Sequence, residues 1–234
     1  WIRDLDADFS LFGVDGAYGS GDGSVWVGAY ADLSAADRSV AVGSRTGQTN
    51  VAGHEVKVWG ASFTGGSNAG QQRYSQIGYN RRDAGTTIND VVTGRIRVGA
   101  LNDIDVIANY YQIGVQGSNG WLTTTDNRGN ASYAQIGHGG DRDSVRDMRL
   151  SGGIFVEAGG NLSLLGGIAY NNHASIGHGG YDNPDDDDDT NLATLGGDIA
   201  VKVGGDVTLQ AGLGYHAHVQ IGHGGGNHYL ADFT

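Results

Sequence analysis

The chain has 234 residues, of which 43 are glycine and none is cysteine, and its formal net charge is −12. The lack of cysteine excludes disulfides, zinc–thiolate sites and cysteine nucleophiles, and the negative charge argues against nucleic acid as a partner because its phosphates would be repelled. No apolar run approaches the ~18 residues of a membrane span, so no membrane insertion is expected.

The first elements expected in chain order are short strands. Residues 1–24 are interpreted as an N-terminal cap or a junction to a preceding unit, and a β-solenoid is expected over 25–234. Segments 25–27 and 40–42 resemble a degraded first unit. Residues 55–59 then alternate between apolar and polar side chains, which is the period-two pattern of a β-strand.

The clearest repeat units follow between residues 94 and 225. Their alternating segments are, in chain order, 95–98, 103–106, 154–158, 161–165, 198–203 and 206–211. No window shows the 3.6-residue stripe of a helix. Three strands per unit, separated by glycine corners, predict one triangular coil of a parallel β-solenoid, because only stacked coils can bury the apolar face that each coil presents. The fold class expected is therefore all-β, with about five to six coils.

A β-propeller is the alternative fold, because propeller blades also repeat every ~40–45 residues. A blade requires four antiparallel strands joined by hairpins. The units here contain three strands, and their corners lack the Asn-Gly or Asp-Gly turns that are typical of hairpins. The parallel solenoid is the preferred interpretation.

The pentapeptide Ile-Gly-His-Gly-Gly occurs three times, at 136–140, 176–180 and 221–225, and a weaker copy ends at Tyr79. Stacked units would place the repeated isoleucines in one column, formed by Ile77, Ile136, Ile176 and Ile221. The repeated histidines would form a second column of His138, His178 and His223. Such a column could bind a transition metal. The preferred interpretation is structural, with each histidine donating to a neighbouring carbonyl at a corner that glycine allows the chain to turn.

Two further columns are expected on the outward side of the same strands. The residue before each isoleucine is predicted to build an amide ladder, as in cross-β assemblies; its members are Gln76, Gln112, Gln135, Ser175 and Gln220. The residue three positions before each isoleucine is aromatic, and stacked rings would add stability; these are Tyr74, Tyr110, Tyr133, His173 and His218. Sugar binding is the alternative role of the aromatic column.

Polar insertions at 115–131, 141–150 and 181–193 are expected to project from one edge of the solenoid. The third insertion carries an acidic run, and oxygen-rich loops suit Ca²⁺. Its acids are Asp182, Asp185, Asp186, Asp187, Asp188 and Asp189. Their spacing matches no familiar calcium loop, so a solvated loop is the preferred interpretation and Ca²⁺ is the one alternative cofactor.

Two carboxylate pairs have a spacing compatible with polysaccharide cleavage, namely Asp103 with Asp105 and Asp198 with Asp206. These acids recur at strand starts beside glycine, which is typical of corner chemistry. The chain contains no Gly-x-Ser-x-Gly, no His-Glu-x-x-His and no phosphate loop. The sequence therefore predicts no catalytic residues and no enzyme.

The unit at 197–212 and the motif at 133–140 resemble filamentous-haemagglutinin-type adhesins, which are large Gly-rich repeat exoproteins. The resemblance covers roughly 50–234 and is clear over 94–225. It implies a right-handed parallel β-helix at the bacterial cell surface. The expected function is an extracellular structural or adhesive solenoid, a segment or subunit of a fibre or giant adhesin. End-to-end self-association is expected, with a host-surface or extracellular glycan as a candidate partner.

Two other functions stay open. A parallel β-helix could process or bind polysaccharide, which would require a groove with clustered acids and aromatic rings. A metal-binding surface module would instead use the histidine column or the acidic run. Fold alone does not decide among these functions.

Overall fold

A computed structural model describes residues 9–12, 25–28, 40–60, 73–79, 91–108, 132–139, 149–167, 171–179, 194–214 and 216–224. Regular secondary structure in these ranges is entirely β. In the same ranges, no helix is long and apolar enough to cross a membrane. The expected all-β class is therefore confirmed for this part of the chain.

The strands form four parallel sheets. The first sheet contains β1 (Phe9–Phe12), β4 (Gln48–Gly53), β8 (Arg95–Ala100), β12 (Ile154–Ala158) and β16 (Ile199–Val203). The second contains β2 (Val25–Gly28), β5 (Val56–Trp59), β9 (Ile104–Ile107), β13 (Leu162–Leu165) and β17 (Val207–Gln210). The third contains β3 (Val40–Val42), β6 (Arg73–Ile77), β10 (Ser132–Ile136), β14 (Ala174–Ile176) and β18 (Val219–Ile221).

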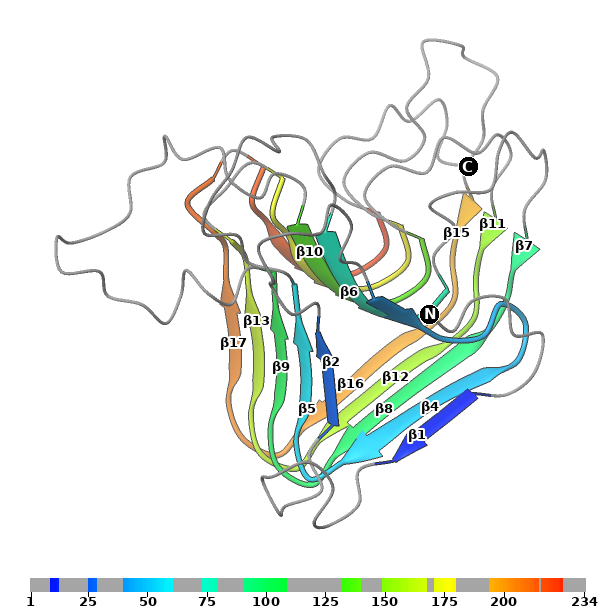
Figure 1. The fold of residues 1–234 in the computed structure, drawn as a ribbon, viewed down its shortest axis with the longest axis horizontal. Helices are drawn as coiled ribbons and strands as arrows, with labels where there is room; N and C mark the ends of the chain where they lie inside the picture. Colours follow the sequence, from blue (N-terminus) through cyan, green and yellow to red (C-terminus); the bar gives the residue numbers. More distant parts are fainter. Residues whose placement is uncertain are drawn as a thin grey trace, which may run out of the picture.

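A fourth, short sheet was not expected from the sequence. It consists of β7 (Val91–Val92), β11 (Arg149–Leu150) and β15 (Thr194–Leu195). Figure 1 shows the three long sheets as sides of a roughly triangular cross-section, with the short sheet at the corner between the third and the first. Strands of two residues are too short to display a hydrophobic period, so the prediction of three strands per unit missed them.

The chain passes once through each long sheet in every coil. Each strand consequently pairs in parallel with its counterparts in the coils before and after, so that Ile154 of β12 is in register with Ile96 of β8 and Ile199 of β16. The five-stranded sheets correspond to five stacked coils, and the parallel β-solenoid is confirmed. Strand β1 lies inside 1–24 and already pairs with β4, so the stacking starts before the boundary expected at residue 25.

The core fills the interior of the triangle because alternate residues of every strand point inward. In β12, Ile154, Val156 and Ala158 are buried, whereas Phe155 and Glu157 are partly exposed. One cluster joins such inward residues from all the long sheets, including Val51, Val56, Val98, Ile104, Ile136, Leu162, Leu164 and Ile176. A coil with neighbours on both sides thus uses them to remove its apolar face from water.

Glycine is required at the corner after the third sheet because successive coils contact each other through their backbones. Gly137 and Gly177 have φ values of 159° and 158°, which side chains rarely adopt. A Cβ on Gly137 would also lie 1.7 Å from the carbonyl oxygen of Gly177, and one on Gly177 would lie 1.8 Å from that of Gly222. No other residue fits between the coils at these positions.

The last described coil leaves its apolar side chains accessible. Val207 and Leu209 of β17 are 51% and 49% exposed. Their counterparts in β13, Leu162 and Leu164, are in register with them and fully buried. The edge formed by β16, β17 and β18 is therefore a continuation of the core that the described residues do not cover. We call it the C-terminal edge.

Candidate functional site

The repeated histidine lies at a buried corner directly after the third sheet. Strand β10 ends at Ile136, Gly137 turns the chain, and His138 is then fully buried. Its Nδ1 accepts a hydrogen bond from the backbone N–H of Tyr79 in the preceding coil at 2.9 Å. Its Nε2 lies 2.7 Å from the carbonyl oxygen of Gly94 at the start of β8. The ring therefore joins two coils and two sheets.

The same pair of contacts recurs at the next two copies of the motif. Nδ1 of His178 accepts from the backbone N–H of His138 at 3.0 Å, and its Nε2 lies 2.9 Å from the carbonyl oxygen of Gly152. For His223 the corresponding distances are 3.1 Å, to the N–H of His178, and 2.8 Å, to the carbonyl oxygen of Gly197. Successive rings stack with centroids 4.9 Å apart. The expected histidine column is present, and each ring contacts a neighbouring carbonyl as expected.

This geometry assigns one tautomer to the rings. An Nδ1 that accepts from an amide carries no proton, so Nε2 carries it and donates to the carbonyl. A metal ion at either nitrogen would have to replace one of these bonds. Among the described residues, no group of three or more His, Cys, Asp or Glu side chains is placed to hold a metal ion. The column is built for hydrogen bonding between coils.

Burial strongly disfavours the charged form of these rings. It lowers the pKa of His138 to about 4 and, with a smaller contribution from His138, that of His178 to about 3. The pKa of His173 is also lowered to about 3, first by burial and then by repulsion from His218. At neutral pH these imidazoles are uncharged, as stacked rings at this spacing require.

The glutamines before the repeated isoleucines do not form the outward amide ladder that the sequence predicts. Gln76 and Gln135 are fully buried. Nε2 of Gln76 donates to the carbonyl oxygens of Gly137 and Gly139, at 2.7 Å and 2.6 Å. Gln135 repeats this contact with Gly177 and Gly179, at 2.8 Å and 2.7 Å. Each amide thus joins its own strand to the corner of the following coil, and we call this contact the glutamine clamp.

The clamp changes in the last two coils. Ser175 replaces glutamine in β14, and its buried Oγ has no hydrogen-bond partner among the residues that the structure describes. Gln220 in β18 donates to the carbonyl oxygen of His223 at 3.0 Å, within its own coil. The corner of the last described coil is accordingly joined to the preceding coil by the histidine contact and backbone bonds, without the two amide bonds found earlier.

The aromatic column is present but is buried rather than outward. Tyr74 and Tyr133 are 1% exposed, and His173 is fully buried. The rings of Tyr74, Tyr133, His173 and His218 stack in order, with centroids 4.9 to 5.0 Å apart. The alternation of side chains along the strand places these rings on the outer face of the third sheet. The rings are nevertheless buried, so the column packs inside the protein and is not exposed to solvent as expected.

Several predicted residues lie outside the described parts of the chain. They are Tyr110, Gln112, Asp182, Asp185, Asp186, Asp187, Asp188 and Asp189. Strand β10 pairs directly with β6, so the residue next to Gln76 in the third sheet is Gln135. The calcium hypothesis for the acidic run stays a prediction.

The carboxylates at strand starts make contacts between coils. Oδ1 of Asp103 accepts from the backbone N–H of Asn161 at 2.7 Å, and Oδ1 of Asn161 accepts from that of Asp206 at 2.9 Å. Asp198 lies at the start of a different sheet. These contacts agree with the corner chemistry expected of these acids.

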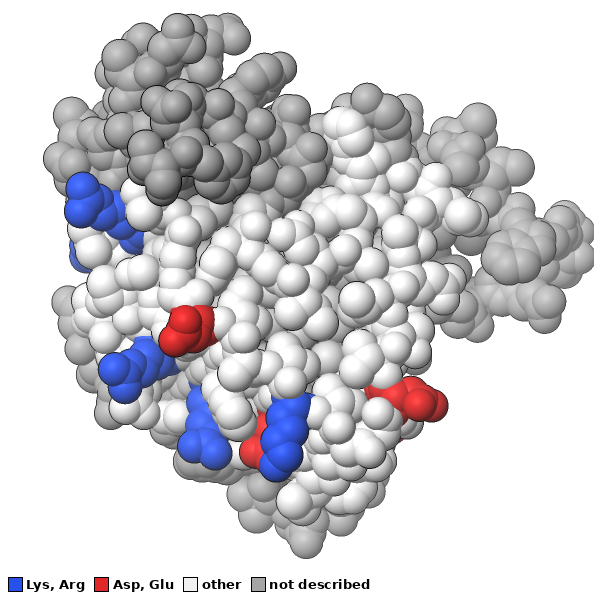
Figure 2. Space-filling view, turned by 180° about the vertical axis from the view of Figure 1, so that it is seen from behind, with Lys and Arg blue, Asp and Glu red and all other residues white. Residues whose placement is uncertain are grey.

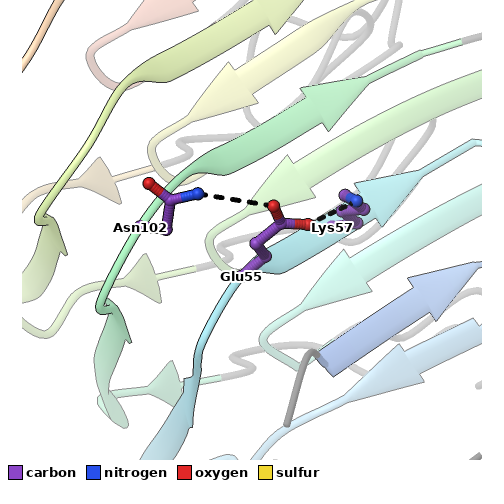
Figure 3. A network of polar contacts seen from close by, with 3 residues as sticks. All are labelled: Glu55, Lys57 and Asn102. Atoms are coloured by element: carbon purple, nitrogen blue, oxygen red, sulfur yellow. Dashed lines mark hydrogen bonds and ion pairs between the residues drawn. The ribbon is translucent and has the colours of Figure 1, made fainter. Parts of the chain in front are cut away.

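Figure 3 shows a further polar contact near this corner. Glu55 pairs with Lys57 at 2.5 Å and accepts from Nδ2 of Asn102 in the next coil at 3.5 Å. Burial is the main cause that raises the pKa of Asp105, and Lys57 partly opposes it. The carboxylates here are held by cations and amides that belong to the solenoid itself.

The outer face of the first sheet carries a hollow that sequence reasoning missed. It is an open depression with a volume of about 360 Å³, and its lining includes Gln48, Asn50, Arg95, Arg97, Gly153, Phe155 and Asp198. In Figure 2, most Lys and Arg side chains in view lie on the side of the first sheet. The signal in the sequence was the outward pair Arg95 and Arg97, two residues apart on one predicted strand.

Comparisons with protein-family models, with curated proteins and with solved structures found no match to this chain.

Proposed function

We propose that this chain is an extracellular structural and adhesive β-solenoid, a segment or subunit of a bacterial surface fibre or giant adhesin. The observation that carries the proposal is the repetition of one corner through successive coils. The histidine contact recurs at three successive corners, the glutamine clamp reinforces the first two of these corners, and neither nitrogen of the histidine ring is left for a substrate or a metal. Contacts of this kind hold stacked coils together and make a long solenoid rigid.

The C-terminal edge supports end-to-end association. Ile221 is 37% exposed although its counterpart Ile176 is fully buried, and the two are in register. No strand of the described residues pairs with the outer side of β16, β17 or β18. A sheet edge of this kind offers backbone groups together with apolar side chains, which favours parallel pairing with a further coil. In a fibre or tandem array that coil comes from the next unit.

Electron microscopy of the purified chain tests the proposal. We expect filaments, or oligomers whose length rises with protein concentration, because each added unit covers a C-terminal edge. A chain that stays monomeric and globular at all accessible concentrations would contradict the fibre.

A matched pair of variants makes this test specific. Leu209 points to the core side of β17 and its neighbour Thr208 to the other face, and both are exposed. Leu209→Asp should abolish association because it places a charge in the new interface, whereas Thr208→Asp should leave association unchanged. Melting of the dilute monomers would show that both variants fold.

A further inference from the structure

The hollow on the first sheet brings charged, amide and aromatic side chains together on one face. Arg95 and Arg97 project from β8, and Gln48 and Asn50 stand beside them on β4 in direct register. Two residues along a strand span about 6.6 Å on one face. The guanidinium groups and amides therefore form a compact patch of hydrogen-bond donors on a rigid sheet.

An aromatic ring holds one of these donors in place. The guanidinium carbon of Arg97 lies 5.0 Å from the ring centroid of Phe155, in register on β12. A cation over a ring is attracted by its face, and the contact restricts the guanidinium group. Phe155 is itself partly exposed, so the rim of the hollow offers an apolar surface next to a charged donor.

Two glycines show that open space on this sheet is permitted by the backbone. A Cβ on Gly153 would meet only the carbonyl oxygen of Asp198, at 3.9 Å, and a Cβ on Gly99 would meet nothing within 4 Å. Neither position has the crowding or the positive φ of the corner glycines. Gly153 lines the hollow and Gly99 does not. The missing side chain at 153 deepens the hollow without being required by the fold.

We propose that the hollow binds a uronic acid residue of an extracellular polysaccharide. The guanidinium groups of Arg95 and Arg97 match a carboxylate, which they can hold with two hydrogen bonds each. Gln48, Asn50 and Asp198 supply donors and acceptors for hydroxyl groups, and Phe155 packs against the C–H face of a sugar ring. The volume of about 360 Å³ lies within the ~300–1,000 Å³ range of small-molecule sites.

The local charge favours this ligand in spite of the net charge of −12. The screening length in physiological salt is about 8 Å, so charges beyond the hollow contribute little. Two acids lie near the arginines: Asp198 lines the hollow itself, and Glu157 is paired with Lys202 at 2.6 Å and is also attracted to Arg97. The lining therefore carries two guanidinium groups against one carboxylate. The inference deepens the adhesive function and rests on it, because it names the glycan that the fibre would hold.

Isothermal titration calorimetry with a galacturonic acid tetramer tests the site on the full chain. We expect binding to the wild type and none of the methyl-esterified, uncharged tetramer. Arg95→Gln and Arg97→Gln should each weaken binding at least about tenfold, since a hydrogen bond to a charged group contributes that much. Gly153→Leu should weaken binding to a similar degree because its side chain would fill the hollow. Lys57→Gln and Gly99→Leu are the matched controls and should change affinity less than about twofold.

Four results would overturn the proposal. They are no binding by the wild type, equal binding of a sulfated tetramer without carboxylates, equal binding of a polyglutamate peptide, and equal losses for Gly99→Leu and Gly153→Leu. Failure here is separate from failure of the fibre. Filaments without tetramer binding would reject the site alone, and binding without filaments would reject the fibre alone.

Discussion

The backbone N–H of His138 donates to Nδ1 of His178 at 3.0 Å while the two imidazole rings stack with centroids 4.9 Å apart. His138 and His178 are thus both backbone donor and side-chain acceptor in a series that runs along the solenoid from Tyr79 to His223. Nε2 of His178 reaches a glycine carbonyl at the start of the first sheet in the same coil. The contact at Nδ1 therefore sets the distance between neighbouring coils. The contact at Nε2 joins the end of a coil to the start of the same coil.

The histidines make the fold sensitive to acid. Their pKa is about 4 for His138 and about 3 for His178, below the ~6.5 of an unfolded chain. The unfolded state therefore binds more protons between these values, and the free energy of unfolding falls as pH drops from about 6.5 towards 4. We expect a loss of roughly 1.4 kcal/mol per pH unit for each such histidine.

Urea unfolding at a series of pH values measures this slope. His178→Gln should lower stability at pH 7 and should also reduce the slope between pH 6 and 4, because one titrating group is gone. His54→Gln is the control, since His54 is exposed. A slope identical in the parent and in His178→Gln would show that the buried histidines do not cause the acid sensitivity.

Gln135→Glu should destabilise the solenoid by about 3 kcal/mol or more. The change keeps the shape of the side chain but removes the two donors to Gly177 and Gly179 and leaves a buried carboxylate facing carbonyl oxygens. Gln220→Glu should lower the free energy of unfolding much less. Gln220 lies in the more exposed last coil and makes one hydrogen bond within that coil. Chemical unfolding of both variants compares them, and equal losses would contradict the clamp.

Ser175→Gln should stabilise the last coil. The longer side chain can reach the carbonyls of Gly222 and Gly224, as Gln135 reaches those of Gly177 and Gly179 one coil earlier. Two new bonds would contribute about 1–3 kcal/mol. Hydrogen exchange should slow at the amides of Gly222 and Gly224, which bond to Ile176 and His178. Faster exchange there would mean that the corner does not accept the clamp.

Two glycines with nearly identical backbones should respond differently to alanine. Gly177 and Gly222 have φ values of 158° and 155°, but only Gly177 has a following coil against its Cα. Gly177→Ala should cost about 3–5 kcal/mol from strain and overlap. Gly222→Ala should cost about 1–2 kcal/mol in the monomer and should also block filament growth. Thermal melting and microscopy check both effects, and equal losses of stability would argue against close coil contact.

The sequence was sufficient for the longer strands of the repeat units and their inward faces, although it missed the two-residue strands of the fourth sheet. In β12 and β13 the period-two pattern identifies Ile154, Val156, Leu162 and Leu164 as core residues, and all four are buried. Long-range stacking followed from the repeated motif, because residues at the same position in each unit must lie in one column. The register of Ile136 with Ile77 and Ile176 confirms this.

The exposure of the outer face of the third sheet was mispredicted. Alternation along a strand predicts the side to which a residue points, but it does not predict what packs against that side. Gln135 points outward in sequence terms, yet the glycine corner of the next coil brings two carbonyls within reach of its amide. The hollow was missed for a related reason. Arg97, Phe155 and Gly153 come from separate units, and only the register of β8 with β12 brings them together.

Nitrogen-detected NMR of the imidazole rings at pH 7 tests the central claim, that the repeated histidine is a structural link between coils, most directly. We predict neutral rings with the proton on Nε2 for His138 and His178, and a coupling across the hydrogen bond between Nδ1 of His178 and the amide of His138. These signals should not move when Zn²⁺ or Ni²⁺ is added. A proton on Nδ1, a charged imidazolium, or metal-induced shifts at these rings would contradict the account.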